Sequence, residues 1–308
     1  MFGHLVNKSV IVAAVLFSFQ TQAMPIQDKP EDFPDALSRQ VFNNFLIDSK
    51  AYGSENKIFT AYGKETNSSH LPCSLNPYDI NSTPITYPTF SQVKQCIQDE
   101  LKEGGWLIIG DSHGGNLFRA LKSAYPKQNI AMMLQWSCAP ARSPKFSDNS
   151  NDKTICFNSM PQIIEWINSD MTIKKVLFAA RYTDERGFGQ FITDIRKGLY
   201  KKDLIIFNAG PKLVNGPMSY LKEQGFKDRY LLPEAAKVKV RTVNDALETL
   251  AAPKVKLFNK YALFCDVNDA CRIISDDLHS FFHDDSSHLQ TFGFLFYGEQ
   301  IKKSKILE

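Results

Sequence analysis

Short apolar runs alternate with helical patterns through the central and C-terminal parts of this 308-residue chain. Near-continuous apolar strands separated by helices are typical of a mostly parallel sheet that helices cover on both faces. We therefore predict an α/β fold. The expected strands are Trp106–Ile109, Ile130–Leu134, Val176–Ala180, Leu204–Phe207 and a later candidate, Tyr261–Cys265. The expected helices between them are Leu117–Ala124, Met160–Ile167 and Phe191–Leu199.

The first 23 residues have the pattern of a secretory signal peptide. Lys8 precedes an apolar run from Val10 to Phe19, and Thr21-Gln22-Ala23 resembles a cleavage site. The run is shorter than the about 20 residues that a membrane span needs, although an uncleaved anchor is the alternative. We find no later stretch suited to a span. We therefore expect a mature chain that begins near Met24, lacks a membrane span and is secreted, extracellular or periplasmic.

The region before the first predicted strand has a different character. Helical spacing covers Ala36–Ile47 and Phe90–Leu101, and a polar, turn-rich stretch over residues 63–88 separates them. We therefore expect residues 24–103 to form an N-terminal extension that precedes a catalytic domain over residues 104–308.

The composition and the cysteines constrain the compartment and the partners. A net charge of +3, with acidic and basic residues interspersed, argues against a nucleic-acid-binding protein. Six cysteines behind a signal peptide indicate disulfides, although spacing alone permits several connectivities and no Cys-x-x-Cys metal motif occurs. Asn67 and Asn81 would accept glycans only in a eukaryotic source. The cysteine pairs that lie close in sequence are Cys73/Cys96, Cys138/Cys156 and Cys265/Cys271.

Polar residues follow three of the predicted strands, where parallel sheets carry their sites. Ser112 follows the first strand, Ser137 follows the second and Arg181 the third. A serine at the start of a helix can act as a nucleophile, because the first amides of the helix stabilise an oxyanion. The alternative is that Ser112 only caps the helix.

A possible base for this serine lies near the C-terminus. Asp285 and His288 are three residues apart, so one loop can carry both, with the carboxylate orienting the imidazole toward Ser112. One alternative is that His288 caps a helix starting near Leu289. Another is a metal site that also uses His279, His283 and nearby aspartates, although Asp-Asp-Ser-Ser after His283 does not favour the helix that such spacing needs. We expect no metal and no cofactor.

These blocks together resemble a known family, the SGNH (GDSL-like) hydrolase superfamily. The closer match is to the extracytoplasmic SGNH domains fused to integral-membrane sugar O-acyltransferases, and it covers about residues 104–300. The segments that carry the resemblance are Gly110-Asp111-Ser112-His113, Cys138-Ala139-Pro140, the strand ending in Ala179-Ala180-Arg181, the Cys265/Cys271 pair and Asp285-x-x-His288-Leu289.

The resemblance implies a three-layer α/β/α sandwich around a mostly parallel central sheet, as in flavodoxin-like folds. It also implies a Ser-His-Asp triad that acts on O-acyl groups, commonly acetyl groups on sugars. Ser112 would attack the acyl carbon, His288 would transfer the proton, and Asp285 would orient His288. The backbone amide of Ser112 would donate to the oxyanion.

The chain departs from the superfamily pattern at two blocks. Ser137 stands where a glycine is usual, and Arg181 stands where the asparagine of Gly-x-Asn-Asp would be. We expect the Ser137 amide and the Arg181 guanidinium to contribute to the oxyanion hole, with a structural salt bridge as the alternative for Arg181. We expect His113 to shape the pocket, with a simple helix-start role as its alternative. Asn208 follows the next strand and does not inherit the asparagine role.

The expected function is that of a secreted serine-dependent acyl-ester enzyme, an O-acetyl esterase or O-acyltransferase acting on acylated carbohydrate. The sequence blocks do not distinguish water from a sugar hydroxyl as the acceptor. Transfer would need a separate acyl-donor protein as a partner. The alternative is a non-catalytic module that binds carbohydrate or a partner, because loss of an oxyanion-hole donor costs about 2.7–4 kcal/mol in the transition state.

Overall fold

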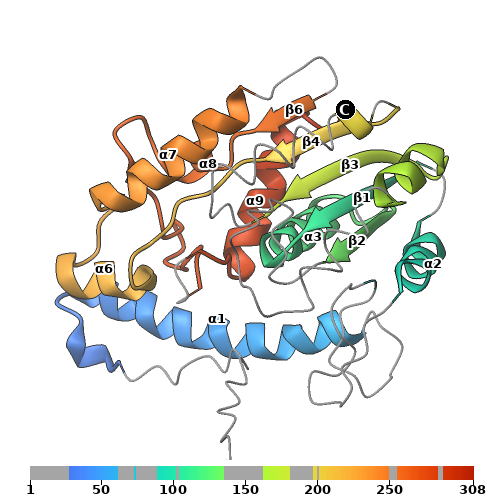
Figure 1. Cartoon of the computed structure of the whole chain (residues 1–308). Helices are drawn as coiled ribbons and strands as arrows, with labels where there is room; N and C mark the ends of the chain where they lie inside the picture. The colour runs from blue at the N-terminus through green and yellow to red at the C-terminus, as the bar shows by residue number, and fades with distance from the viewer. Residues whose placement is uncertain are drawn as a thin grey trace, which may run out of the picture.

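Five parallel strands form the centre of the molecule (Figure 1). The computed structural model describes residues 28–61, 73, 89–101, 104–134, 162–180, 197–199, 201–249, 255–283 and 287–308. The strands in their spatial order are β2 (Ile130–Leu134), β1 (Gly105–Gly110), β3 (Ile173–Ala179), β4 (Asp203–Phe207) and β6 (Val255–Phe258). Because every neighbouring pair is parallel, the carboxyl ends of all five strands lie at one edge of the sheet.

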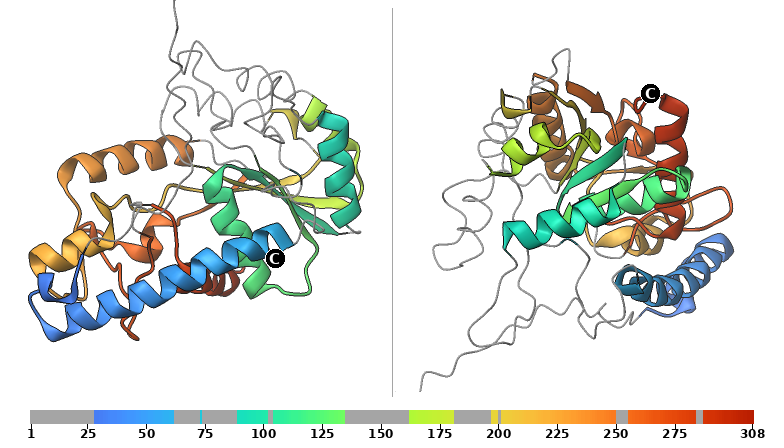
Figure 2. Two further views of the ribbon diagram at one scale, coloured as in Figure 1. Left: turned by 90° about the horizontal axis from the view of Figure 1, so that it is seen from below. Right: turned by 90° about the vertical axis from the view of Figure 1, so that its right-hand side faces the viewer.

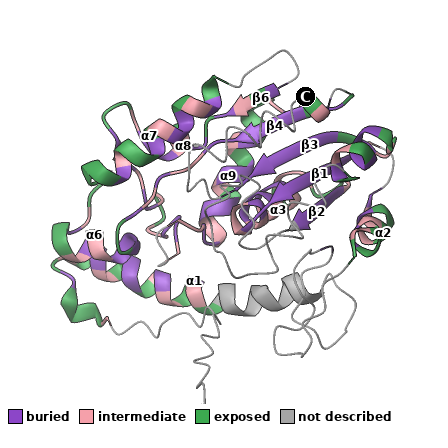
Figure 3. Ribbon diagram, viewed as in Figure 1, coloured by how far each residue is buried: buried purple, intermediate pink, exposed green. Residues whose placement is uncertain are grey.

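The strands form where the sequence can be buried on both faces of a sheet. Every residue of β1 is buried, and most of the sheet is buried as well (Figure 3). Successive side chains of β1 enter different hydrophobic clusters: Trp106 and Ile108 belong to one, and Leu107 and Ile109 to the other. Since side chains alternate across a strand, the two clusters lie on opposite faces.

Helices cover both faces, as the two views in Figure 2 show. On the face of Trp106, the cover is α1 (Ala36–Ala61), α3 (Ser112–Ala124) and α9 (Thr291–Ser304). The opposite face is covered by α2 (Phe90–Glu100), a helix over residues 162–169 and α7 (Glu234–Glu248). The architecture is therefore the predicted three-layer α/β/α sandwich with a parallel central sheet.

The N-terminal region takes part in the same core. Phe33, Val41, Phe42 and Phe45 are buried and belong to the cluster that α3 and α9 also line. No helix in the part of the chain that the structure describes is long and apolar enough to cross a membrane, and the predicted signal peptide lies outside that part.

Smaller elements complete the chain. A 3-10 helix, η1 (Pro30–Asp32), precedes α1, and α6 (Gly216–Gln224) follows β4. Strands β5 (Tyr230–Leu231) and β7 (Ala270–Cys271) pair antiparallel outside the main sheet. Of the predicted helix over residues 191–199, only residues 197–199 are described.

One predicted strand is wrong. Residues 261–264 of the expected strand Tyr261–Cys265 form helix α8 (Tyr261–Phe264), and the fifth strand is β6, a few residues earlier. Asn259 starts the helical turn, because its Oδ1 accepts a hydrogen bond from the backbone N–H of Ala262 at 3.0 Å. Within this turn Phe264 is buried, Tyr261 and Leu263 are half-buried and Ala262 is exposed.

Two of the three sequence-adjacent cysteine pairs are disulfides in the described structure. Cys73 is bonded to Cys96 of α2, and Cys265 is bonded to Cys271 of β7. Cys138 and Cys156 lie outside the described residues.

Candidate active site

The turn between β1 and α3 positions Ser112. Gly110, the last residue of β1, lies so close to β3 that a Cβ atom there would be 1.9 Å from the carbonyl oxygen of Ala179. Asp111 follows as the N-cap of α3, and its Oδ1 accepts a hydrogen bond from the backbone N–H of His113 at 2.8 Å. Asp111 therefore caps the helix, and Ser112 is the first helical residue at the carboxyl edge of the sheet.

A loop before α9 positions His288. Phe282 and Leu289 form an antiparallel bridge, and the backbone N–H of His283 donates to the carbonyl oxygen of His288 at 2.8 Å. The helix starts at Thr291, after its N-cap Gln290, so His288 does not cap it. The side chain of His288 is instead directed at α3.

The structure brings Ser112 and His288 together. The Nε2 atom of His288 lies 2.7 Å from the Oγ atom of Ser112, although 176 residues separate them in sequence. This distance is that of a hydrogen bond between a hydroxyl and a ring nitrogen. A neutral imidazole in this position can accept the hydroxyl proton, which is the arrangement that activates a serine nucleophile.

His113 extends the pair. Its ring stacks on the ring of His288, with the centroids 4.9 Å apart and the planes inclined by 22°. Its backbone belongs to the first turn of α3, and its side chain also lines a pocket. The sequence offered two alternatives for His113, a place at the start of the helix and a place beside the pocket. In the structure His113 has both.

Three of the predicted site residues, Asp285, Ser137 and Arg181, lie outside the described residues. Ala180, which directly precedes Arg181, is buried at the carboxyl end of β3 and lines the same pocket as His113.

His279, which a metal site would group with His288, instead contacts α1 and α9. His279 Nδ1 lies 2.8 Å from Asp48 Oδ2 of α1, and the His279 ring stacks on Phe292 with centroids 3.7 Å apart. His279 therefore connects α1 to the C-terminal segment. Among the described residues, no group of three or more His, Cys, Asp or Glu side chains is arranged to hold a metal ion.

The pocket extends from His113 along the carboxyl edge of the sheet to α7. Ser287 and His113 lie at one side, Ala179, Ala180 and Phe207 come from the ends of β3 and β4, and Ala236, Val240 and Val243 come from α7. Three lysines that the sequence analysis did not select also line it: Lys212, Lys239 and Lys260.

Asn208 holds the turn that carries Lys260. Its side-chain Oδ1 accepts hydrogen bonds from the backbone N–H groups of Lys260 at 2.7 Å and Tyr261 at 3.3 Å. Its Nδ2 donates to Asn259 Oδ1 at 3.1 Å. Asn208 is thus engaged in joining the end of β4 to the end of β6.

Lys260 is the most deeply buried cation of the pocket. Its residue is 5% exposed, and its ammonium lies 5.2 Å from the centroid of the Tyr297 ring. Burial lowers the pKa of Lys260 to about 8, and the negative charge of Asp111 opposes this decrease. Lys260 was missed in the sequence, because a lysine that follows a strand usually lies in a solvent-exposed turn. The only available signal was its position just after β6.

Solved structures of other proteins are similar to this chain. The periplasmic domain of the lipopolysaccharide acetyltransferase from Salmonella ser. Paratyphi A is similar in structure, with a TM-score of 0.55, 16% sequence identity and coverage of 71% of this chain and 90% of that chain. The C-terminal catalytic domain of peptidoglycan O-acetyltransferase A from Streptococcus pneumoniae gives a TM-score of 0.37, with 14% identity over 66% of this chain and 92% of that one.

No curated protein is significantly similar to this chain in sequence. The family model described as the SGNH domain (fused to AT3 domains) matches residues 81–303, a span that includes every strand in the described residues and both Ser112 and His288. The chain therefore belongs to the family of SGNH domains that occur fused to AT3 domains.

Proposed function

We propose that this chain is a serine-dependent acyl-ester enzyme that acts on O-acylated carbohydrate outside the cytoplasm. The observation that carries the proposal is the 2.7 Å separation between His288 Nε2 and Ser112 Oγ. Membership of the SGNH family supports it, as does the fold shared with the periplasmic domain of a lipopolysaccharide acetyltransferase. The signal-peptide pattern of residues 1–23 supports an extracytoplasmic location.

In the first half of the reaction, Ser112 Oγ attacks the acyl carbon and its proton passes to His288 Nε2. The negative charge that forms on the acyl oxygen lies at the N-terminus of α3, where the first backbone N–H groups have no acceptor within the helix. The Ser112 amide donates to this oxyanion, and the Ser137 amide and the Arg181 guanidinium complete the oxyanion hole.

Collapse of the tetrahedral intermediate breaks the bond between the acyl carbon and the sugar oxygen. His288 returns its proton to that oxygen, so the sugar leaves as an alcohol and the acyl group remains on Ser112. Asp285, three residues before His288, orients the ring and stabilises the imidazolium that forms during each transfer.

The second half of the reaction removes the acyl group. His288 takes a proton from the incoming hydroxyl, whose oxygen attacks the acyl carbon. The bond between the acyl carbon and Ser112 Oγ then breaks, and His288 returns the proton to that oxygen. Water in this step gives an esterase, and a carbohydrate hydroxyl gives an O-acyltransferase. For transfer from a donor protein, the acyl group placed on Ser112 in the first half comes from that donor instead of a sugar ester. The AT3 domains to which this family is fused indicate the kind of partner that supplies it.

Covalent labelling tests the nucleophile without knowledge of the substrate. We expect phenylmethylsulfonyl fluoride to add one sulfonyl group to the mature chain, on the peptide that contains Ser112. Ser112→Ala and His288→Ala should both prevent labelling. Ser123→Ala, at the exposed far end of the same helix, and His283→Gln, in the same loop as His288, serve as matched controls that should label normally.

Turnover then tests the reaction class. The chain should release p-nitrophenol from p-nitrophenyl acetate and cleave or transfer acetyl groups on acetylated glycans, and Ser112→Ala should lower the rate at least about a thousandfold. Free acetate as the product identifies an esterase, and an acetylated acceptor glycan identifies a transferase. Equal behaviour of the wild type and Ser112→Ala on all substrates would contradict the proposal and favour a non-catalytic binding module.

A further inference from the structure

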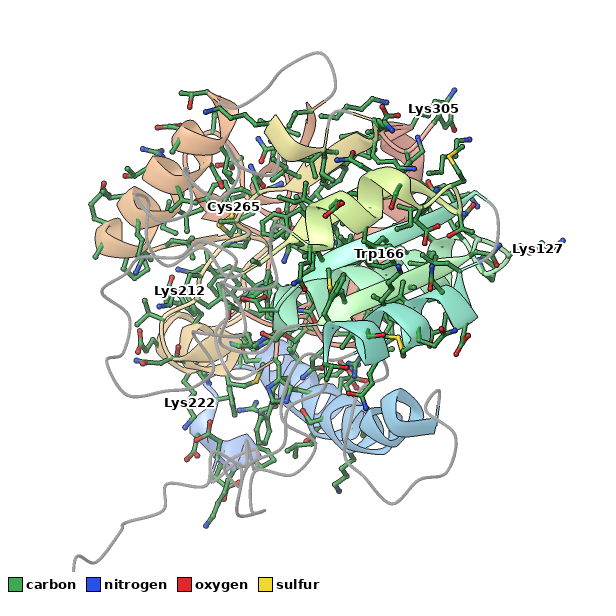
Figure 4. All side chains as sticks on the ribbon, turned by 45° about the vertical axis from the view of Figure 1, so that its right-hand side comes forward. Lys127, Trp166, Lys212, Lys222, Cys265 and Lys305 are labelled. Atoms are coloured by element: carbon green, nitrogen blue, oxygen red, sulfur yellow. A yellow bond between two sulfur atoms is a disulfide. The ribbon has the colours of Figure 1, made fainter. Side chains whose placement is uncertain are left out.

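The pocket beside the reactive pair is lined by lysines and by no acidic residue that the structure describes. Lys212 comes from the segment after β4, Lys239 from α7 and Lys260 from the turn after β6, so three separate elements bring a lysine to one cavity. Figure 4 labels Lys212 at its place in the fold. None of the lining residues that the structure describes is an aspartate or a glutamate. The lining is therefore cationic.

The pocket lies beside the reactive pair, although neither Ser112 nor His288 is among its lining residues. His113, whose ring stacks on His288, and Ser287, the residue before His288, both line it. Ala179 lines it as well, and its carbonyl oxygen is the atom that approaches Gly110 at the base of the Ser112 turn. A substrate whose acyl group lies at Ser112 can thus extend over the lysines.

The position of Lys260 indicates what the pocket would hold. Burying an ammonium group is costly unless a negative charge compensates it. The charge of Asp111 compensates part of this cost, yet burial still lowers the pKa of Lys260 to about 8. An anion in the pocket would add a second favourable partner, and Lys212 and Lys239 would contact it from the other sides. The apolar remainder of the lining suits a sugar ring.

We propose that this pocket binds an anionic group, a carboxylate or a phosphate, on the carbohydrate whose O-acyl group reacts at Ser112. The inference rests on the proposed function for the reaction and deepens it by naming the substrate class. Charge-assisted hydrogen bonds from lysines to a carboxylate or phosphate would supply the selectivity. Neutral sugars of the same shape would lack these bonds.

Binding is measured first, with protein that cannot turn over. In the Ser112→Ala background, calorimetry compares methyl glucuronoside and glucose 6-phosphate with neutral methyl glucoside. We expect at least one anionic sugar to bind about tenfold more tightly than the neutral one, since a hydrogen bond to a charged group contributes on this order. The two anionic arms distinguish a carboxylate from a phosphate. Equal affinity for all three sugars would overturn the proposal, whether or not the chain proves to be an enzyme.

Lysine variants then test which side chains provide the preference for an anionic sugar. Lys239→Gln and Lys212→Gln, each added to Ser112→Ala, should reduce the preference for the anionic sugar severalfold. Lys237→Gln is the matched control, because this lysine lies on the same helix, pairs with Glu234 at 3.2 Å and is not part of the lining. It removes the same charge and should retain the preference. A preference that survives both pocket variants, or that Lys237→Gln removes equally, would contradict the assignment.

Turnover provides a second readout. In the otherwise unmodified chain, kcat/KM for acetylated methyl glucuronoside or acetylated glucose 6-phosphate should exceed that for acetylated methyl glucoside by about tenfold. Lys239→Gln should lower this ratio, whereas Lys237→Gln, which lies outside the lining, should leave it unchanged. Absence of turnover on every ester, together with selective binding of an anionic sugar to Ser112→Ala, would reject the proposed function and retain the pocket.

Discussion

The ring of His113 lies on the ring of His288, with the centroids 4.9 Å apart and the planes 22° from parallel. One ring comes from the first turn of α3 and the other from the loop before α9. The contact therefore connects the segment that carries Ser112 to the segment that carries its hydrogen-bond partner, and it restrains the orientation of the imidazole that we propose as the base.

We expect His113→Ala to reduce kcat/KM for acetyl esters by roughly two- to tenfold, because a stacked aromatic pair contributes about 0.5–1.5 kcal/mol. His113→Phe retains a ring at this position and should restore most of the loss. Steady-state kinetics on p-nitrophenyl acetate checks both variants. Equal loss in the two would show that the ring nitrogens of His113 matter more than its stacking.

Two glycines near the site should respond to the same substitution with opposite signs. Gly110→Ala would place a methyl group 1.9 Å from the Ala179 carbonyl oxygen, so we expect a loss of about 1–3 kcal/mol or more in the free energy of unfolding. A Cβ at Gly115 meets nothing within 4 Å, and alanine is favoured in helices, so Gly115→Ala should raise stability by up to about 1 kcal/mol. Urea denaturation measures both.

The disulfide between Cys73 and Cys96 spans 23 positions of the chain. This disulfide restricts the unfolded chain by closing a loop. We therefore expect Cys73→Ala/Cys96→Ala to lower the free energy of unfolding by about 3 kcal/mol. Denaturation of the wild type and the variant without reductant measures this difference. Under dithiothreitol, both proteins lose their remaining disulfides and the difference should largely vanish. A difference that persists under reduction would indicate lost packing around the sulfur atoms.

Lys260 should give stability an unusual dependence on alkaline pH. The folded protein releases its proton near pH 8, because burial lowers the pKa of this lysine from 10.5 to about 8. Between these values the unfolded chain binds more protons, so folding becomes more favourable as the pH rises. From pH 8 to 10, the wild type should gain on the order of 2–3 kcal/mol relative to Lys260→Met.

Four of the five strands, including the edge strand β2, could be predicted from the sequence, and the other edge strand, β6, could not. Strands β1 to β4 have nearly continuous apolar runs, because helices cover both of their faces. Strand β6 differs because its exposed Lys256 interrupts the apolar pattern. The apolar residues after it resembled a strand, but Asn208 and Asn259 bind the backbone N–H groups of that segment and start a helical turn.

The candidate site could also be predicted only in part. Ser112 and His288 stand in recognisable sequence blocks, but the distance between their side chains depends on the packing of α3 against α9, which spacing in sequence does not determine. The lysines of the pocket were missed because their sequence surroundings match those of solvent-exposed lysines. Their convergence becomes visible only once the ends of β4 and β6 lie side by side.

Gly298 determines how closely the two helices that flank the reactive pair can approach. A Cβ there would lie 2.3 Å from the carbonyl oxygen of Ala120, at a contact roughly two turns beyond Ser112. Ser112 begins one helix and His288 lies just before the other, so the backbone separation at this glycine sets the reach of a hydroxyl to an imidazole. The distance between the two side chains thus depends in part on the absence of a side chain at a position remote from both of them.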